Sequence, residues 1–543
     1  MKARKILCLL LALAMILSLA ACGGNNSSSG GNNANNSNTD NSTPVENNTG
    51  NDDGDAQTTF RVAIMRYSEA WGLDFSQTAF LKEASEVTGA NIEWETYYAA
   101  DWAEQKSLLL AGGNLPDAFF GSVCLTDSDI SKNKASFWEL TDLIQENMPN
   151  LTRILAEDEM MKSLCTDANG EIYTLPKKLP LRPITANQMF INKDFLDALN
   201  MEMPQTYEDL AEFMIACGTQ DPDGNGEDDT YGQSIVASLQ SDLNNLLIYF
   251  GLSNSRNKNY MGLDNGTPFF IPASEKYKEA VKWAHYLYEN GALDPERFTQ
   301  DNSLAQAKVQ AEGGSKVGVH WQWSVDAETG GNASQFVLCE AVEGPDGERY
   351  VETDPTSLNY GRNEFIITKT CTNPGLLLKW ADYFYTDLAS LQNYYGSIAD
   401  GKIRENEDGT YEVLVPEDGS SLDASSWINS FRDHGPKYMD VAFESKVILP
   451  TDQGDGVKLA ANEVDKAHAH DIFPVCSYSD EQLETLTLLT TDIYNYVETT
   501  YANWVINGGI DEEWDAYLQQ LQAMQLDKVV EVQTDAYNLT TGK

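Results

Sequence analysis

An alternation of strands and helices near the start of the apolar-rich part of the chain constrains the fold more than any other feature. Residues 60–65 (FRVAIM) and 91–97 (NIEWETY) predict strands, and a short buried strand is expected at 115–121. The helices between them are predicted to end at Gly89 and at Gly112-Gly113. A strand–helix–strand–helix–strand order predicts a parallel sheet with helices on both faces.

Ligands of such sheets bind beyond the carboxyl ends of the strands. Loops that follow the three predicted strands therefore form a rim where a ligand is expected. The rim residues are Tyr67, Trp71, Tyr97, Tyr98 and Ser122.

A second structural unit is expected after the two prolines of residues 179–183, because about 520 residues beyond the leader are too many for one core. Its predicted elements are helices at 195–200, 206–217 and 274–290, a strand at 316–320, a crossing strand at 363–368, a helix at 374–388 and two final helices at 480–497 and 511–525.

The N-terminus is typical of an exported lipoprotein. Basic residues precede an apolar stretch at 6–19, and Leu19-Ala-Ala-Cys22 resembles a lipobox. We expect a signal peptide at 1–22, with diacylated Cys22 as the anchor on the outer face of the cytoplasmic membrane. An ordinary cleaved signal with a chance cysteine is the alternative. Residues 23–56 are mostly Asn, Ser, Gly, Thr and Asp, which predicts a disordered linker.

Charge and motif content exclude several functions. The net charge of −47 disfavours nucleic acid and anionic lipid as partners. Gly-x-Ser-x-Gly, His-Glu-x-x-His and P-loop motifs are absent from the sequence. The six cysteines beyond Cys22 leave both disulfides and buried free thiols open.

Residues 221–229 (DPDGNGEDD) match the first half of an EF-hand loop, with oxygen ligands at positions 1, 3 and 5 and glycine at position 6. Position 12 is Gly232, so Asp229 at position 9 would have to supply the closing carboxylate. The alternative is an Asx-turn loop that binds no ion. We expect a structural Ca²⁺ with the ligands Asp221, Asp223, Asn225, Glu227 and Asp229.

Several segments, in this order along the chain, are similar to family 1 extracellular solute-binding proteins, particularly to the long Gram-positive lipoproteins that serve carbohydrate ABC importers. They are residues 113–120 (GNLPDAFF), 172–176 (IYTLP), 191–196 (INKDFL), 203–210 (MPQTYEDL), 287–291 (LYENG), 293–296 (LDPE), 344–347 (GPDG) and 510–517 (IDEEWDAY). The resemblance covers residues 58 to 543.

The resemblance implies an α/β chain with a two-lobed type II periplasmic-binding-protein fold, hinge strands, and a ligand cleft between the lobes. Residues 57–185 and 360–435 would form the N-terminal lobe, and 186–359 and 436–543 the C-terminal lobe. It also implies that the chain captures a sugar or oligosaccharide and delivers it to ABC transporter permease subunits. We separately expect a monomer without catalytic residues. A surface glycoside-active enzyme, or a partner that presents its ligand to a membrane sensor, is the alternative.

A sugar cleft needs aromatic rings for the C–H faces of the sugar and polar groups for its hydroxyls. For each aromatic residue, core packing is the alternative role. The candidate ligand-binding residues are Tyr67, Trp71, Tyr97, Ser122, Trp321, Trp323, Arg362, Asn363, Trp427 and Arg432.

Overall fold

Strand β1 (Thr58–Arg66) is buried on both faces in the computed structural model. Val62 and Ile64 pack into one apolar cluster, whereas Ala63 and Met65 pack into another. Successive side chains of a strand point to opposite faces, so the two clusters lie on the two sides of the sheet. Burial on both faces is typical of a parallel sheet covered by helices.

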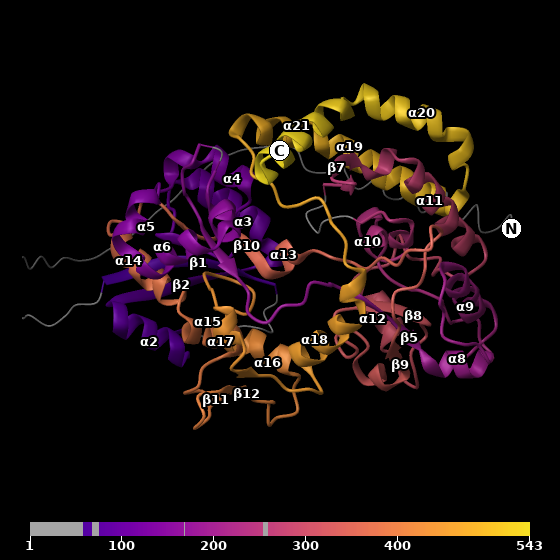
Figure 1. Ribbon diagram of the computed structural model, residues 1–543, viewed down its shortest axis with the longest axis horizontal. Helices are drawn as coiled ribbons and strands as arrows, with labels where there is room; N and C mark the ends of the chain where they lie inside the picture. The colour runs from indigo at the N-terminus through magenta and orange to yellow at the C-terminus, as the bar shows by residue number, and fades with distance from the viewer. Residues whose placement is uncertain (1–57, 68–74, 168, 254–258) are drawn as a thin grey trace, which may run out of the picture. The chain divides into compact units, whose positions relative to one another are not determined.

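The predicted parallel sheet is confirmed, since β1 pairs in parallel with both β2 (Ala90–Tyr98) and β3 (Ala118–Phe120). Strand β10 (Tyr360–Ile367) returns from much later in the chain and lies antiparallel to β3 and to β4 (Leu175–Lys178). The resulting order is β2-β1-β3-β10-β4. Figure 1 labels β1, β2 and β10 of this sheet. The expected crossing strand at 363–368 is therefore part of this first sheet.

Helices of the first sheet end where the sequence predicts. Gly89 and Gly113 follow α2 and α3 with φ angles of 76° and 71°, a left-handed conformation that glycine adopts without steric cost. The helices of this part of the chain are α2 (Ala79–Thr88), α3 (Ala99–Gly112), α4 (Asp127–Lys132), α5 (Thr141–Asn147), α6 (Pro149–Glu157), α7 (Glu159–Cys165) and α14 (Pro374–Tyr383).

The structure describes residues 58–67, 75–167, 169–253 and 259–543, all within one unit that spans Ala56–Lys543. The predicted signal peptide, Cys22, the predicted linker and Trp71 lie outside the described residues.

The second sheet is small and antiparallel, with β5 (Gln188–Asn192) between β8 (Val319–Gln322) and β9 (Phe336–Leu338). Its apolar cluster continues into the C-terminal helices. A third C-terminal helix, α21, extends beyond the two that the sequence predicts. The elements around this sheet are α8 (Lys193–Leu199), α9 (Tyr207–Thr219), α10 (Leu239–Asn244), β6 (Met261–Asp264), β7 (Thr267–Phe270), α11 (Glu275–Glu289), α12 (Asn302–Val309), α19 (Asp480–Asn507), α20 (Ile510–Ala523) and α21 (Leu526–Thr541).

A fourth apolar cluster joins Leu179 to residues between Leu391 and Met439. Strand β12 (Tyr411–Val413) pairs there with β13 (Val447–Ile448), which lies beyond the lobe boundary expected at residue 435. The other elements of residues 355–465 are α13 (Pro355–Asn359), α15 (Asp387–Tyr395), β11 (Ile403–Glu405), α16 (Leu422–Asn429), α17 (Val441–Glu444) and α18 (Gly454–Asp465).

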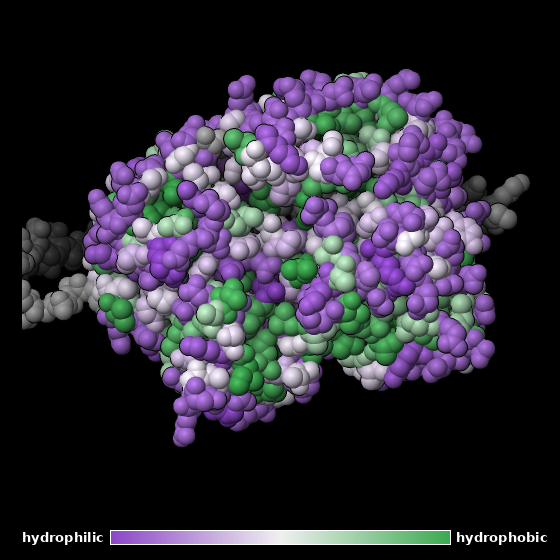
Figure 2. Space-filling model, viewed as in Figure 1, coloured by the Kyte–Doolittle hydropathy of each residue, from purple (hydrophilic) through white to green (hydrophobic). Residues whose placement is uncertain are grey.

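On the face drawn in Figure 2, hydrophilic residues dominate the periphery, and hydrophobic residues gather where Figure 1 places α16.

All six described cysteines are buried free thiols, which decides between the two possibilities that the sequence left open; they are Cys124, Cys165, Cys217, Cys339, Cys371 and Cys476.

Candidate functional site

One cavity of about 590 Å³ is lined by residues of both sheet units. Its volume lies within the range of small-molecule binding sites, which is about 300–1,000 Å³. The lining residues are Tyr67, Ser122, Val123, Leu125, Thr126, Asp127, Leu164, Lys177, Leu179, Arg182, Trp323, Thr356, Ser357, Leu358, Tyr360, Gly361, Arg362, Asn363, Asp423, Trp427, Arg432, Asp433, His434 and Val475.

The carboxyl ends of β1 and β3 form one wall, where parallel sheets place their ligands. Arg66, the last residue of β1, is fully buried and donates hydrogen bonds to the backbone carbonyls of Trp427 and Ser430. These carbonyls lie at the C-terminal end of α16, where a cation interacts favourably with the helix dipole. Arg66 thus holds the Trp427 segment beside the end of β1.

Aromatic rings gather on this wall. The ring centroids of Tyr67 and Trp427 are 6.1 Å apart, and that of His434 lies 5.4 Å from the first and 5.6 Å from the second. Burial, followed by the charge of Lys177, lowers the pKa of His434 to about 3, so its ring is neutral at physiological pH. Neither ring nitrogen of His434 has a hydrogen-bond partner among the described residues.

The chain reverses sharply after α16 so that residues 432–434 reach the cavity. Arg432 adopts a left-handed φ of 49°, and Gly435 follows with a φ of 81°. A Cβ atom at Gly435 would lie 1.9 Å from the ring of Phe120, so only glycine allows this segment to pack on β3.

The opposite wall comes from the second sheet and from the proline-flanked crossing segment. Trp323 follows the end of β8, and the Arg182 guanidinium lies 4.6 Å from the centroid of its ring. The ammonium of Lys458 lies 4.7 Å from the same centroid. Cations at these distances interact with the ring electrons and fix the orientation of Trp323.

Two ion pairs of the buried Arg432 guanidinium support the floor of the cavity. Arg432 Nη2 lies 2.9 Å from Asp423 Oδ1 and 3.0 Å from Asp455 Oδ2. Burial alone would lower the pKa of Arg432, but the carboxylate of Asp455 raises it well above its ordinary value. Partial burial would raise the pKa of Asp433, but the positive charges of Arg182, Arg432 and Lys177 lower it to about 2.

A second buried pair connects the sheet to this floor. Lys177 Nζ lies 2.7 Å from Glu364 Oε1, and Glu364 Oε2 accepts hydrogen bonds from the backbone N–H groups of Ser122 and Gly435. Glu364 therefore ties β3, β10 and the residue 432–435 segment together.

Seven of the ten predicted ligand-binding residues line the cavity: Tyr67, Ser122, Trp323, Arg362, Asn363, Trp427 and Arg432. Strand β10 has a register shift between Gly361 and Phe365, and Asn363 lies within it with a φ of 62°. Such a bulge redirects side chains, here those of Arg362 and Asn363, which both contact Asp127.

Two predicted ligand-binding residues lie elsewhere. Trp321 is 7% exposed and packs in the core of the second sheet, outside the cavity lining. Tyr97 is the second-last residue of the edge strand β2 and packs against Trp102, with 5.1 Å between ring centroids. An edge strand lies too far from β10 for Tyr97 to reach the lining. Trp71 is outside the described residues.

Sequence reasoning missed Lys177, Arg182, Asp423, Asp433 and His434. Two signals were available. Arg182 lies between the prolines that mark the crossing segment, and Asp433-His434 directly follow Arg432 in the sequence.

The acidic loop at residues 221–229 contacts a lysine. Lys316 Nζ lies 2.5 Å from Asp223 Oδ2 and 2.9 Å from Asp229 Oδ2. Asp221 Oδ2 accepts a hydrogen bond from the Gly226 N–H, whereas its Oδ1 is buried without a described partner. No group of three or more His, Cys, Asp or Glu side chains is arranged to hold a metal ion in the part of the chain that the structure describes.

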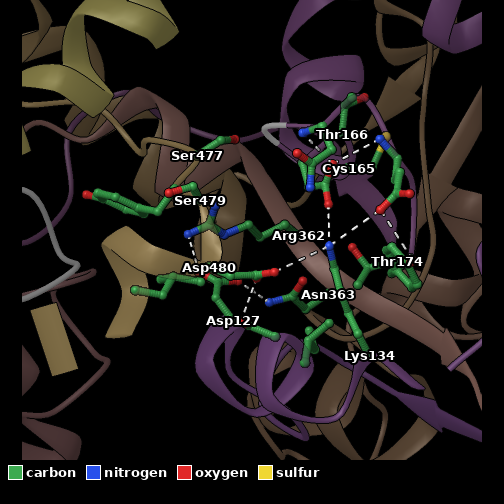
Figure 3. A pocket seen from close by; sticks show the side chains of 18 of the residues that line it. Asp127, Lys134, Cys165, Thr166, Thr174, Arg362, Asn363, Ser477, Ser479 and Asp480 are labelled. Carbon is green, nitrogen blue, oxygen red and sulfur yellow. Dashed lines mark hydrogen bonds and ion pairs between the residues drawn. The ribbon is translucent and has the colours of Figure 1, made fainter. Parts of the chain in front are cut away.

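A smaller pocket lies beside the cavity and is filled by ion pairs (Figure 3). Its volume is about 90 Å³. Lys134 Nζ lies 2.7 Å from Asp167, 3.5 Å from Glu171 and 3.9 Å from Asp480 at the start of α19. Ser131 Oγ donates a hydrogen bond of 2.6 Å to Asp480. These contacts join the first sheet unit to α19 and leave little room for a ligand.

Among the described residues, no helix combines the length and the apolar composition that a bilayer span requires.

A two-lobed α/β body whose cavity is lined from both sheets defines a ligand-binding protein. The family of bacterial extracellular solute-binding proteins matches residues 74–389, more than half of the chain, and the chain belongs to this family. The resemblance and the two-lobed fold expected from the sequence are thereby confirmed.

Relatives from two Gram-positive bacteria extend the comparison. The chain is 29% identical over 484 residues to the fructooligosaccharide ABC transporter substrate-binding protein FusA of Streptococcus pneumoniae, which covers 86% of this chain and 87% of FusA. A FusA EF-hand mutant in complex with fructo-nystose superposes with a TM-score of 0.77 at 26% identity, over 89% of this chain and 100% of that one. The polygalacturonan/rhamnogalacturonan-binding protein YtcQ of Bacillus subtilis is 27% identical over 291 residues, 50% of this chain and 53% of YtcQ.

Proposed function

We propose that this chain is a lipid-anchored extracellular solute-binding protein that captures an oligosaccharide for an ABC transporter. The observation that supports this proposal most directly is the cavity, which combines the rings of Tyr67, Trp323 and Trp427 with hydrogen-bonding side chains. Rings stack on the C–H faces of sugars, and polar side chains bind their hydroxyls. The name of FusA, a fructooligosaccharide-binding protein, supports the same ligand class.

Calorimetry and thermal unfolding of the purified protein with a panel of oligosaccharides test the ligand class. We expect at least one oligosaccharide to raise the melting temperature, because a ligand that binds only the folded state stabilises it. The same ligand is expected to change tryptophan fluorescence, since Trp323 and Trp427 line the cavity. A panel without any shift or heat of binding would contradict the proposal.

Binding without chemistry separates this proposal from a glycoside-active enzyme. Incubation with a bound oligosaccharide should return it uncleaved, and products of hydrolysis would contradict the proposal.

Delivery to a permease predicts that cells lacking this chain lose uptake of the ligand. Unchanged uptake together with a lost transcriptional response would favour the membrane-sensor alternative.

Anchoring rests on Cys22 and on the linker composition of residues 23–56. Cell fractionation should find the wild-type protein with the membrane and the Cys22→Ser protein in the medium. A Cys22→Ser protein that remains with the membrane would contradict the anchor.

Structural Ca²⁺ in the 221–229 loop is part of the proposal. Its ligands would be Asp221, Asp223, Asn225, Glu227 and Asp229. Hard cations prefer such oxygen ligands, and the buried Asp221 Oδ1 without a described partner is a free acceptor for one. The Lys316 ammonium contacts two of these side chains and would have to move aside. The FusA EF-hand mutant indicates that this relative has an EF-hand loop.

Chelation tests the calcium proposal. Removal of Ca²⁺ should lower the melting temperature, and Lys316→Met should bind Ca²⁺ more tightly than the wild type because a competing cation is gone. A melting temperature that is unchanged by chelation, with no metal found by elemental analysis, would contradict it.

We further propose that the lobes comprise residues 57–185 with 360–435, and 186–359 with 436–543, and that the protein is a monomer. Small-angle scattering should show one chain per particle and compaction with the bound oligosaccharide, as hinge closure requires. A dimer, or unchanged dimensions at saturation, would contradict this part of the proposal.

A further inference from the structure

Positive groups that line the cavity already have carboxylate partners. Lys177 contacts Glu364, Arg362 contacts Asp127, and Arg432 contacts Asp423 and Asp455. Arg182 lies 3.9 Å from Asp455 and donates a 2.6 Å hydrogen bond to the hydroxyl of Tyr394. An acidic ligand would therefore find no cation among the described lining residues that lacks a carboxylate neighbour.

Asp433 is the opposite case. This side chain lines the cavity, and its Oδ1 atom is buried without a hydrogen-bond partner among the described residues. The nearby positive charges hold its pKa at about 2, so the carboxylate is ionised at physiological pH. An ionised carboxylate only accepts hydrogen bonds, and a sugar hydroxyl can donate one.

His434 adds a neutral group beside this charge. Its two ring nitrogens, both without a described partner, supply one donor and one acceptor. A hydroxyl can serve either nitrogen, whereas a ligand carboxylate can only accept. The polar atoms of Asp433 and His434 that have no described partner can therefore bind hydroxyl groups, and they disfavour a negatively charged ligand.

We propose that the cavity selects neutral oligosaccharides over those built from uronic acids, and that Asp433 determines this selectivity. The inference rests on the proposed oligosaccharide-binding function. A ligand carboxylate beside Asp433 would face that charge, and like charges repel, while the cations around it are already paired with carboxylates. Discrimination by charge is therefore expected even between sugars of the same length and linkage.

Calorimetry with chemically matched ligands tests the inference. The probes are neutral fructo-, malto-, xylo- and galacto-oligosaccharides of three to four units, tetragalacturonic acid, and its carboxyl-reduced neutral counterpart. We expect a neutral oligosaccharide to bind at least about 100-fold more tightly than the acid at low salt. Carboxyl reduction should improve the binding of the galacturonan, and added salt should narrow the difference.

Variants assign the effect to Asp433. Asp433→Asn should reduce the neutral-to-acidic selectivity at least tenfold, whereas Asp433→Glu, which keeps the charge, should retain most of it. Asp515→Asn removes one negative charge from the exposed face of α20 and is the matched control, with unchanged selectivity. Equal selectivity in Asp433→Asn and the wild type would overturn the role of Asp433.

Other outcomes separate the two proposals. Acid that binds as tightly as every neutral sugar would overturn the inference and leave the proposed function intact. Absence of binding by both classes would overturn the proposed function and the inference with it. If Asp433→Asn fails to fold, the neutral-to-acidic selectivity of Asp433→Glu and the salt dependence of the wild-type selectivity test the inference in its place.

Discussion

The large cavity and the Lys134 pocket are neighbours, and Asp127, Arg362 and Asn363 line both of them. They differ in whether their polar side chains have hydrogen-bond or ion-pair partners. Lys134 contacts three carboxylates in a space of about 90 Å³. The cavity is larger, and polar atoms of Asp433 and His434 have no described partner there. Buried polar atoms are nearly always hydrogen-bonded, so the atoms of Asp433 and His434 that line the cavity are open to hydrogen bonds from a ligand.

Two neighbouring tryptophans mark the boundary of the cavity and carry the largest expected effects. Trp321→Ala should lower the free energy of unfolding by about 3–5 kcal/mol because it empties a core site. Trp323→Ala should instead weaken oligosaccharide binding by about 30-fold, as loss of a central aromatic contact does. Urea unfolding and calorimetry on both variants measure the two effects, and equal affinity losses would contradict this division.

Removal of the Arg432 charge should be the next largest effect. The side chains of Arg432 and Asp455 are 4% and 3% exposed. Arg432→Met therefore leaves the buried Asp455 carboxylate without its nearest cation. We expect a loss of about 3 kcal/mol in unfolding free energy, the low end of the range for such pairs, since Arg182 still lies 3.9 Å from Asp455. A loss below about 1 kcal/mol in urea unfolding would contradict a buried ion pair at this place.

His434 makes the cavity wall sensitive to acid. Its folded pKa is about 3, below the ordinary value of 6.5, so the unfolded chain binds a proton first as the pH falls. Stability from this group is therefore present above pH 6.5 and is lost as the pH falls from 6.5 toward 3. Wild type should lose up to about 1.4 kcal/mol per pH unit relative to His434→Gln. Parallel pH profiles for the two proteins in urea unfolding would contradict a buried neutral His434.

The Lys134 pocket should show the smallest effects. Its lysine side chain is 24% exposed and that of Asp480 is 57% exposed, so solvent screens their pairing. Lys134→Met should cost about 1 kcal/mol or less and change oligosaccharide affinity less than twofold. A large loss of affinity in Lys134→Met would show that this pocket, and not only the cavity, takes part in binding.

Local patterns were sufficient to predict the three parallel strands of the first sheet. The apolar run of β1, the alternation in β2 and the glycines after α2 and α3 specify strands, helices and their ends through neighbouring residues alone. The antiparallel insertion of β10 between β3 and β4 joins residues far apart in sequence, and no local pattern specifies that pairing.

Prediction of the site residues from local sequence succeeded only in part. Trp323 follows the end of a strand and lines the cavity, but Trp321, only two residues earlier, packs in the core. The role of Asp433 depends on Arg182 and Lys177, which reach it from distant segments, so its charge environment could not be predicted from neighbouring residues. The predicted last helix, 511–525, ends at the junction after α20, and no helix was predicted for the residues that form α21.

A crystal structure of the protein with the oligosaccharide that most raises its melting temperature tests the central claim most directly. The account predicts that the sugar lies in the large cavity, with a ring against Trp323 or Trp427 and hydroxyls on Asp433. A sugar bound beside Lys134, or anywhere outside the residues that line the cavity, would contradict it.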